Sequence, residues 1–236
     1  VHLAAGQYYV VVRSAGADQT GHYLLSVNDA DRNFFYRNGA SGIDVSTDFI
    51  GGNGGVTITS STAERVSFNN NSSTGILVHA RGALRFASVD ASNNGSFGLY
   101  ADIANGSSGL PATLMNTGFF NNRMTGLFLM TRGPITATNI DSGNNHDGDN
   151  DKQNNDIGGV HLDNTAGSGA VSILRTNPLW NNWFGNNEGV GLFIKANGSI
   201  SLTRVTANDN ASRGAVLDNC LWSGSELDTT CSGTGT

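Results

Sequence analysis

The sequence predicts an all-β solenoid, a fold in which short strands stack from one repeat to the next. Three observations predict this class. A short motif recurs along most of the chain, the apolar residues inside each copy alternate as they do in a strand, and Gly, which turns favour, contributes 32 of the 236 residues. The apolar spacing of a helix is absent from these copies.

Each copy of the motif consists of an Asn, a Gly four residues later, and a short run whose first and third residues are aliphatic. Seven copies are present, and their Asn and Gly residues are Asn38 and Gly42, Asn71 and Gly75, Asn94 and Gly98, Asn122 and Gly126, Asn155 and Gly159, Asn187 and Gly191, and Asn210 and Gly214. The copies recur about every 23 residues, with insertions of about five to ten residues between some of them, which is the pattern of a repeat protein.

The alternation inside the copies indicates which kind of solenoid to expect. A turn and a second alternating segment usually follow the run after Gly, as in Leu84-Arg85-Phe86. Each repeat therefore carries two or three short strands, and stacking the repeats places equivalent strands about 4.8 Å apart in a sheet. The sequence predicts a parallel β-helix of about seven coils.

The repeated Asn-Asn-x-x-x-Gly pattern resembles that of the right-handed β-helix repeat proteins, the broad pectate-lyase-like superfamily found in secreted bacterial proteins. The resemblance covers about residues 33 to 219 and implies a single-stranded, right-handed parallel β-helix with an extracellular or cell-surface location. It carries no specific activity, because one fold supports many unrelated functions.

Two β-rich runs, residues 7–13 and 21–27, precede the repeats and are expected to form a hairpin. They are similar to the closing strands of bacterial pre-peptidase C-terminal domains. We divide the chain into a hairpin or strand-exchange segment at 1–28, the β-helix at 29–219, and a C-terminal cap and tail at 220–236. Because an isolated hairpin is marginal in water, its strands are expected to add to another sheet.

The motif Gly and Asn residues have structural roles in this fold. Each Gly is expected to supply a turn of positive φ or a close backbone approach, and the Asn side chains are expected to form a ladder of amides along the stack. Four Phe residues, each three places before a motif Asn, are expected in the core: Phe35, Phe68, Phe119 and Phe184.

Charge and hydropathy limit the partners. The formal net charge of −6 argues against nucleic acid, which favours a basic surface. No apolar run is long enough to span a membrane.

The superfamily includes enzymes whose sites use an Arg beside calcium-binding Asp residues, a pair or trio of Asp residues, or a Lys or His residue. Such sites need charged residues that converge on one face. The outward residues four places after each Gly are Ser46, His79, Asp102, Met130, Asp163, Lys195 and Asp218. Asp102 and Asp163 should lie two coils apart, about 10 Å, with Met130 between them, which is long even for an inverting pair of carboxylates. We expect no enzymatic activity.

One polar insertion, residues 144–156, contains the alternating residues Asp147, Asp149 and Asp151. Their carboxylates are ligands that Ca²⁺ prefers, which makes calcium the one cofactor candidate. The spacing departs from that of an EF-hand, because Lys152 occupies the place of the loop Gly and no Glu closes the loop. A hydrated surface loop is the alternative.

Cys220 and Cys231 are the only cysteines. An even pair in a secreted chain is most simply a disulfide, and it would hold the terminal segment over the last coil as a cap.

A stripe of apolar and aromatic residues is the strongest functional signal. The residue two places after each Gly lies between two inward positions and should point outward, yet six coils in succession place there Leu77, Tyr100, Phe128, His161, Phe193 and Val216. Three readings remain open: cover by the insertion 177–183 or by the N-terminal hairpin, binding of another subunit, or stacking on a polysaccharide.

These observations predict a secreted structural or adhesive solenoid of the cell surface, with self-association or another surface protein as its partner. A filament assembled through the N-terminal strands is one form of it. The alternative is a carbohydrate-active β-helix, either a lyase, a glycoside hydrolase or a polysaccharide-binding module.

Overall fold

The described part of the molecule consists of strands, turns and connecting loops. The computed structural model describes residues 23–24, 35–47, 54–60, 65–106, 109–146, 158–177 and 181–219. These residues contain no helix, and every strand pairing among them is parallel. The predicted all-β class with parallel sheets is confirmed. Since the described residues form no helix, none among them is available to cross a membrane.

The strands form two parallel sheets, one of seven strands and one of eleven. The seven-stranded sheet contains β2 (Ile43–Ser46), β5 (Ile76–His79), β8 (Leu99–Ile103), β10 (Leu127–Thr131), β12 (Val160–Asp163), β15 (Leu192–Lys195) and β18 (Ala215–Asp218). The main path of the eleven-stranded sheet contains β1 (Tyr23–Leu24), β3 (Val56–Thr59), β6 (Leu84–Ala87), β9 (Ala112–Phe120), β11 (Ile135–Gly143), β13 (Val171–Leu174) and β16 (Ile200–Leu202). Four strands lie off this path: β4 (Val66–Ser67), β7 (Val89–Asp90), β14 (Asn182–Gly185) and β17 (Val205–Thr206).

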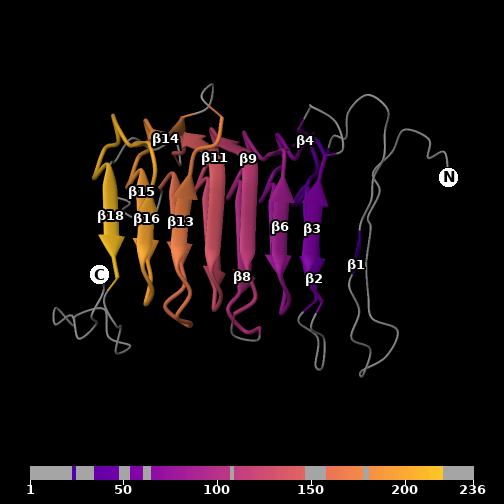
Figure 1. Cartoon of the computed structure of the whole chain (residues 1–236). Helices are drawn as coiled ribbons and strands as arrows, with labels where there is room; N and C mark the ends of the chain where they lie inside the picture. The colour runs from indigo at the N-terminus through magenta and orange to yellow at the C-terminus, as the bar shows by residue number, and fades with distance from the viewer. Residues whose placement is uncertain are drawn as a thin grey trace.

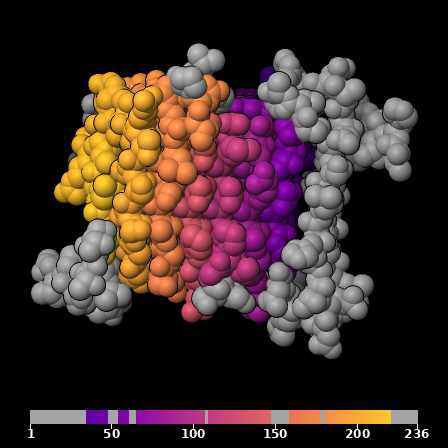
Figure 2. Space-filling model, viewed as in Figure 1, coloured from indigo at the N-terminus to yellow at the C-terminus, as the bar shows by residue number. Residues whose placement is uncertain are grey.

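The chain visits the two sheets in turn. Each strand of the seven-stranded sheet before β18 is followed in sequence by one or two strands of the other sheet, and strands pair with their equivalents in neighbouring repeats. The repeats therefore follow one another along the molecule in chain order, from indigo to yellow in Figures 1 and 2.

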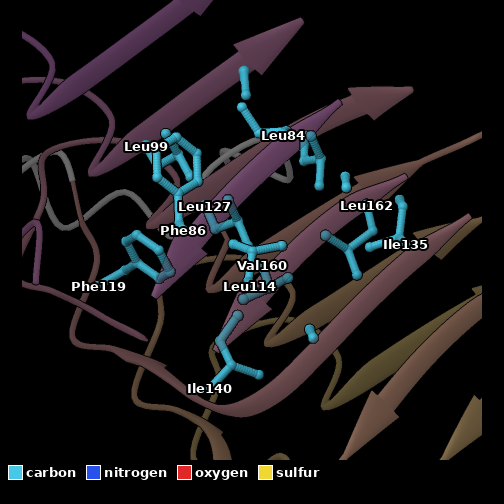
Figure 3. Packing of buried hydrophobic residues seen from close by; sticks show 14 of the residues in the cluster. Leu84, Phe86, Leu99, Leu114, Phe119, Leu127, Ile135, Ile140, Val160 and Leu162 are labelled. Atoms are coloured by element: carbon cyan, nitrogen blue, oxygen red, sulfur yellow. The ribbon is translucent and has the colours of Figure 1, made fainter. Parts of the chain in front are cut away.

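The inward faces of both sheets share one core. In β10 the side chains of Leu127 and Leu129 have no exposed surface, whereas Phe128 between them is half-buried on the opposite face. Leu192 and Ile194 of β15 are buried in the same way. This period of two is the strand alternation expected from the sequence, and Figure 3 shows how side chains from successive strands meet in the core.

The predicted column of Phe residues is confirmed. Phe68, Phe119 and Phe184 are fully buried. Phe35, in the first described repeat, is partly buried and stacks on Phe68 with ring centroids 4.6 Å apart.

The predicted amide ladder runs along the whole stack. The Nδ2 of each member donates to the Oδ1 of the next at 2.8–3.1 Å, and the members are Asn38, Asn71, Asn94, Asn122, Asn145, Asn187 and Asn210. The fifth member corrects the sequence alignment, because Asn145 takes the place assigned to Asn155, which lies outside the described residues. In this repeat an insertion separates the ladder Asn from Gly159.

The residue before each ladder Asn makes the turn. Its φ is positive in every repeat, at Arg37 (54°), Asn70 (58°), Asn93 (58°), Asn121 (54°), Asn144 (54°), Asn186 (57°) and Asp209 (56°). Asn and Asp tolerate this left-handed conformation better than most residues with a side chain. The doubled Asn of the motif therefore combines a turn residue with a ladder residue.

The motif Gly supplies the close approach and not the positive φ. A Cβ at Gly98 would lie 2.6 Å from the carbonyl oxygen of Ala91 and 2.8 Å from the Nδ2 of Asn122. A side chain at this position would displace the backbone or the ladder, which is why Gly recurs there.

At the N-terminal end of the eleven-stranded sheet, Tyr23 and Leu24 of β1 pair in parallel with Val56 and Thr57 of β3. The rest of the expected hairpin lies outside the described residues. Part of the segment 1–28 thus adds a strand to the repeats that follow it in the same chain.

Candidate interaction surface

The predicted stripe lies on the outer face of the seven-stranded sheet. Its six residues are aligned directly from strand to strand, in the order Leu77, Tyr100, Phe128, His161, Phe193 and Val216. All six side chains are half-buried. The sequence placed these residues together, and the structure brings all of them into one continuous row.

The rings of the stripe pack against one another along the row. Tyr100 and Phe128 are stacked with centroids 5.2 Å apart and planes 3° apart. Phe128 and His161 meet edge to face at 4.5 Å, and His161 and Phe193 do so at 4.7 Å. Aromatic pairs in these arrangements contribute about 0.5–1.5 kcal/mol beyond burial. Because ring faces are used between neighbours, the row offers mainly ring edges to a partner.

Residues beside the row extend the aromatic surface. Phe97, in the loop before β8, contacts Tyr100 and Phe128 edge-on at 5.3 and 5.9 Å. Phe97 was not predicted from the sequence, although it stands directly before the motif Gly98. At the C-terminal side, the Nζ of Lys195 lies 5.4 Å from the ring centroid of Phe193, a cation–π contact.

The outward residues four places after each motif Gly form a second column beside the stripe, and several of them are charged. Burial, and to a smaller extent the charge of Asp102, raises the pKa of the Tyr100 hydroxyl above its usual value. Tyr100 is therefore neutral and able to donate a hydrogen bond at neutral pH.

Two carboxylates of this column, those of Asp102 and Asp163, stabilise turns. Asp102 and Asp163 are aligned on either side of Met130, as the sequence predicted. The Oδ1 of Asp102 accepts from the N–H of Ala104 at 3.0 Å, and the Oδ1 of Asp163 accepts from the N–H of Thr165 at 2.9 Å. Both bonds are local turn contacts between a side chain and the backbone two residues later.

The insertion 177–183 does not cover the stripe at its described ends. The N–H of Asn177 donates to the Oδ1 of Asn139 at 3.3 Å, and Trp183 is aligned with Asp141 of β11. Both contacts lie in the eleven-stranded sheet. The described residues at both ends of this insertion therefore lie against the other sheet.

A second charged cluster, missed from the sequence, lies on the outer face of the eleven-stranded sheet. Asp90, Gly118 and Asp141 are aligned on three successive strands. The Nη1 of Arg65 occupies the space that a Cβ at Gly118 would fill, so the guanidinium lies between the two carboxylates. Asp90 also accepts from the Nδ2 of Asn69 at 2.9 Å.

The electrostatics of this cluster follow from its partial burial. Burial lowers the pKa of the Arg65 guanidinium, and the charges of Asp90 and Asp141 oppose that shift. Burial also raises the pKa of the Asp141 carboxyl, which the N–H of Trp183 and the charge of Arg65 lower by smaller amounts. Arg65 thus links three repeats across Gly118.

This cluster could not be predicted while Asn155 was taken as the ladder residue. Asp90 and Asp141 each stand four residues before a ladder Asn, but this is visible only when Asn145 is taken as the ladder residue. The repeat pattern also does not predict that the long side chain of Arg65 extends across a neighbouring repeat.

Two further predictions fall outside the described residues. These are the proposed calcium ligands Asp147, Asp149 and Asp151, and the proposed disulfide between Cys220 and Cys231. Within the described residues, no group of three or more His, Cys, Asp or Glu side chains is placed to hold a metal ion.

A comparison with known proteins finds no matching family model, no matching curated protein and no matching solved structure.

Proposed function

We propose that residues 29–219 form a single right-handed parallel β-helix of about seven coils. The alternation of the chain between two parallel sheets supports this arrangement, as does the amide ladder, whose shortest steps are 23 residues. The right hand is expected because parallel crossovers between strands of one sheet are almost always right-handed, and it agrees with the resemblance of the sequence pattern.

We propose that the protein is a secreted structural or adhesive component of the cell surface, and that the stripe is where it binds another copy of itself. The observation that carries this proposal is the unbroken alignment of six apolar or aromatic residues on an outward strand face, where polar residues are the rule. From Tyr100 to Phe193 the rings contact each other as side chains do in a protein core, and this favours a protein partner.

The size of the face indicates the strength of the contact. Seven strands about 4.8 Å apart, each about four residues long, present roughly 400 Å². This is about half of what one partner contributes to a standard interface. A single contact would be weak, and repetition of the contact along an assembly would make it effective.

The test is sedimentation velocity over a range of protein concentrations. Phe128→Glu should abolish concentration-dependent association, because it places a charge at the centre of the contact. Thr136→Glu is the matched control, since Thr136 is a half-buried outward residue of the other sheet, and it should associate as the wild type does. A wild type that stays monomeric at every concentration, or equal effects of the two variants, would reject the interface.

The N-terminal strands offer a second route to assembly, the filament. The parallel pairing of β1 with β3 supports it, because it shows that residues of the segment 1–28 can extend the eleven-stranded sheet. We propose that the same segment adds to the sheet of a neighbouring copy, and an interface between unlike surfaces of this kind does not close. Deleting residues 1–28 should shorten the assemblies seen by electron microscopy, and filaments that persist unchanged would rule this connection out.

A further inference from the structure

An aromatic platform lies beside the Arg65 cluster, on the outer face of the eleven-stranded sheet. The indole of Trp183 extends across Gly143 and Gly185, and its ring atoms occupy the space that a Cβ at either glycine would fill. These two glycines are aligned on β11 and β14. Because neither has a side chain, the large ring lies against the backbone of two adjacent strands.

Phe120 extends the platform onto the neighbouring strand. Its Cε2 lies 3.1 Å from the position of a Cβ at Gly118, so its ring leans over a third glycine. The centroids of Phe120 and Trp183 are 6.2 Å apart and their planes differ by 24°. The two rings are therefore stacked with a lateral offset, which leaves part of each ring face uncovered by the other, and their residues are half-buried.

Polar groups fix the indole and surround it. The Nε1 of Trp183 donates to the Oδ1 of Asn208 at 2.8 Å, and its backbone N–H donates to the Oδ1 of Asp141 at 3.0 Å. Asp141 is aligned with Trp183 on the neighbouring strand β11 and interacts with the Arg65 guanidinium, and Asn208 holds the indole nitrogen. A ligand on the rings would meet both hydrogen-bond donors and acceptors at the rim.

We propose that the platform formed by Phe120 and Trp183 binds a neutral pyranose of a polysaccharide. The C–H face of a pyranose carries a partial positive charge that matches the negative face of an aromatic ring, and its hydroxyls can exchange hydrogen bonds with the carboxylate, guanidinium and amide at the rim. The positions of the two rings are fixed before a ligand binds, so binding costs little side-chain conformational entropy.

The surroundings disfavour the other ligands that stack on Trp. A nucleobase brings phosphates, which a chain of net charge −6 repels. A quaternary ammonium group prefers a cage of aromatic rings without a cation nearby, whereas Arg65 lies next to this platform. The proposal is independent of the interface proposed above, because the stripe lies on the other sheet.

The test is isothermal titration calorimetry of the full chain with three probes: a β-1,4-linked glucose hexamer, a β-1,4-linked N-acetylglucosamine hexamer and a single-stranded DNA decamer. Saturable binding of a hexasaccharide is expected, and no binding of the DNA. Trp183→Ala should weaken the binding at least tenfold, and Phe120→Ala several-fold. Phe128→Ala, on the stripe, should bind as the wild type does.

Circular dichroism and thermal unfolding establish that each variant is folded. Should Trp183→Ala fail to fold, Trp183→Phe serves in its place, and its smaller ring should weaken binding several-fold. Absence of binding to both hexasaccharides, preference for the DNA, or equal affinity of wild type and platform variants would each overturn the proposal. A loss of self-association with intact sugar binding would separate the two surfaces.

Discussion

Asn122→Ala tests whether the amide ladder holds the repeats together. Asn122 lies in the middle of the ladder and has no exposed surface. Its Oδ1 accepts from the backbone N–H and the Nδ2 of Asn94, both at 3.0 Å. Its Nδ2 donates to the carbonyl of Ala91 and to the Oδ1 of Asn145, both at 3.1 Å.

The magnitude follows from which groups lose a partner. The Nδ2 of Asn94 keeps a bond to the carbonyl of Phe68, and the Oδ1 of Asn145 keeps a bond from the backbone N–H of residue 122. The N–H of Asn94 and the carbonyl of Ala91 lose the side-chain partner. A buried polar group left without a partner costs about 1–3 kcal/mol, so the expected loss in the free energy of unfolding is roughly 2–6 kcal/mol.

Urea unfolding followed by circular dichroism measures this loss, with Asn210→Ala as the matched control. Asn210 accepts the same two bonds from Asn187, but it lies in the last described repeat and is only half-buried. Water can replace its bonds, and we expect less than half the loss seen for Asn122→Ala. Equal losses, or a loss below about 1 kcal/mol for Asn122→Ala, would refute the role of the ladder. An unchanged m-value is required for the comparison.

Three further predictions concern the faces, the charges and the cysteines. Leu192→Ala should cost about 2–5 kcal/mol in urea unfolding, and Phe193→Ala much less, so equal large losses would contradict the assignment of faces. Burial raises the pKa of Asp141, so the folded state binds its proton more readily than the unfolded state. The wild type should therefore gain stability relative to Asp141→Asn as the pH falls through the carboxyl range, and a relative loss of stability of the wild type would contradict this. Thiol labelling without reductant should find Cys220 and Cys231 unreactive, whereas two labelled thiols would exclude the disulfide.

The strand faces and the outward columns could be predicted because a period of two and a fixed repeat determine them together. Once Leu127 and Leu129 are assigned to the core, Phe128 must point outward, and equivalent residues of the next repeat must lie beside it. The stripe therefore followed from counting residues after each Gly. Its half-burial did not follow, because that depends on ring orientations between neighbouring strands.

The repeat with the long insertion could not be aligned from the sequence. Asn155 satisfies the motif spacing to Gly159, whereas Asn145 does not satisfy it but occupies the ladder position through its hydrogen bonds to Asn122 and Asn187. Local spacing and ladder position give different answers here, and the stacking decides in favour of the ladder. The error concealed Asp141 and with it the Arg65 cluster, since long side chains that cross a repeat leave no periodic signal.

The interior and the exterior of the stack are subject to different constraints. Every inward position must match the same position in the next repeat, so Leu, Ile, Phe, Asn and Gly recur there for reasons of stacking alone. Outward positions have no such requirement, and a run of aromatic residues at Phe128 or a bare backbone under Trp183 needs another cause. Burial of the Trp183 indole required the absence of side chains at Gly143 and Gly185 on two different strands. Neither glycine occupies a motif position, so stacking of the repeats does not explain them, whereas a flat aromatic platform for the proposed saccharide requires both.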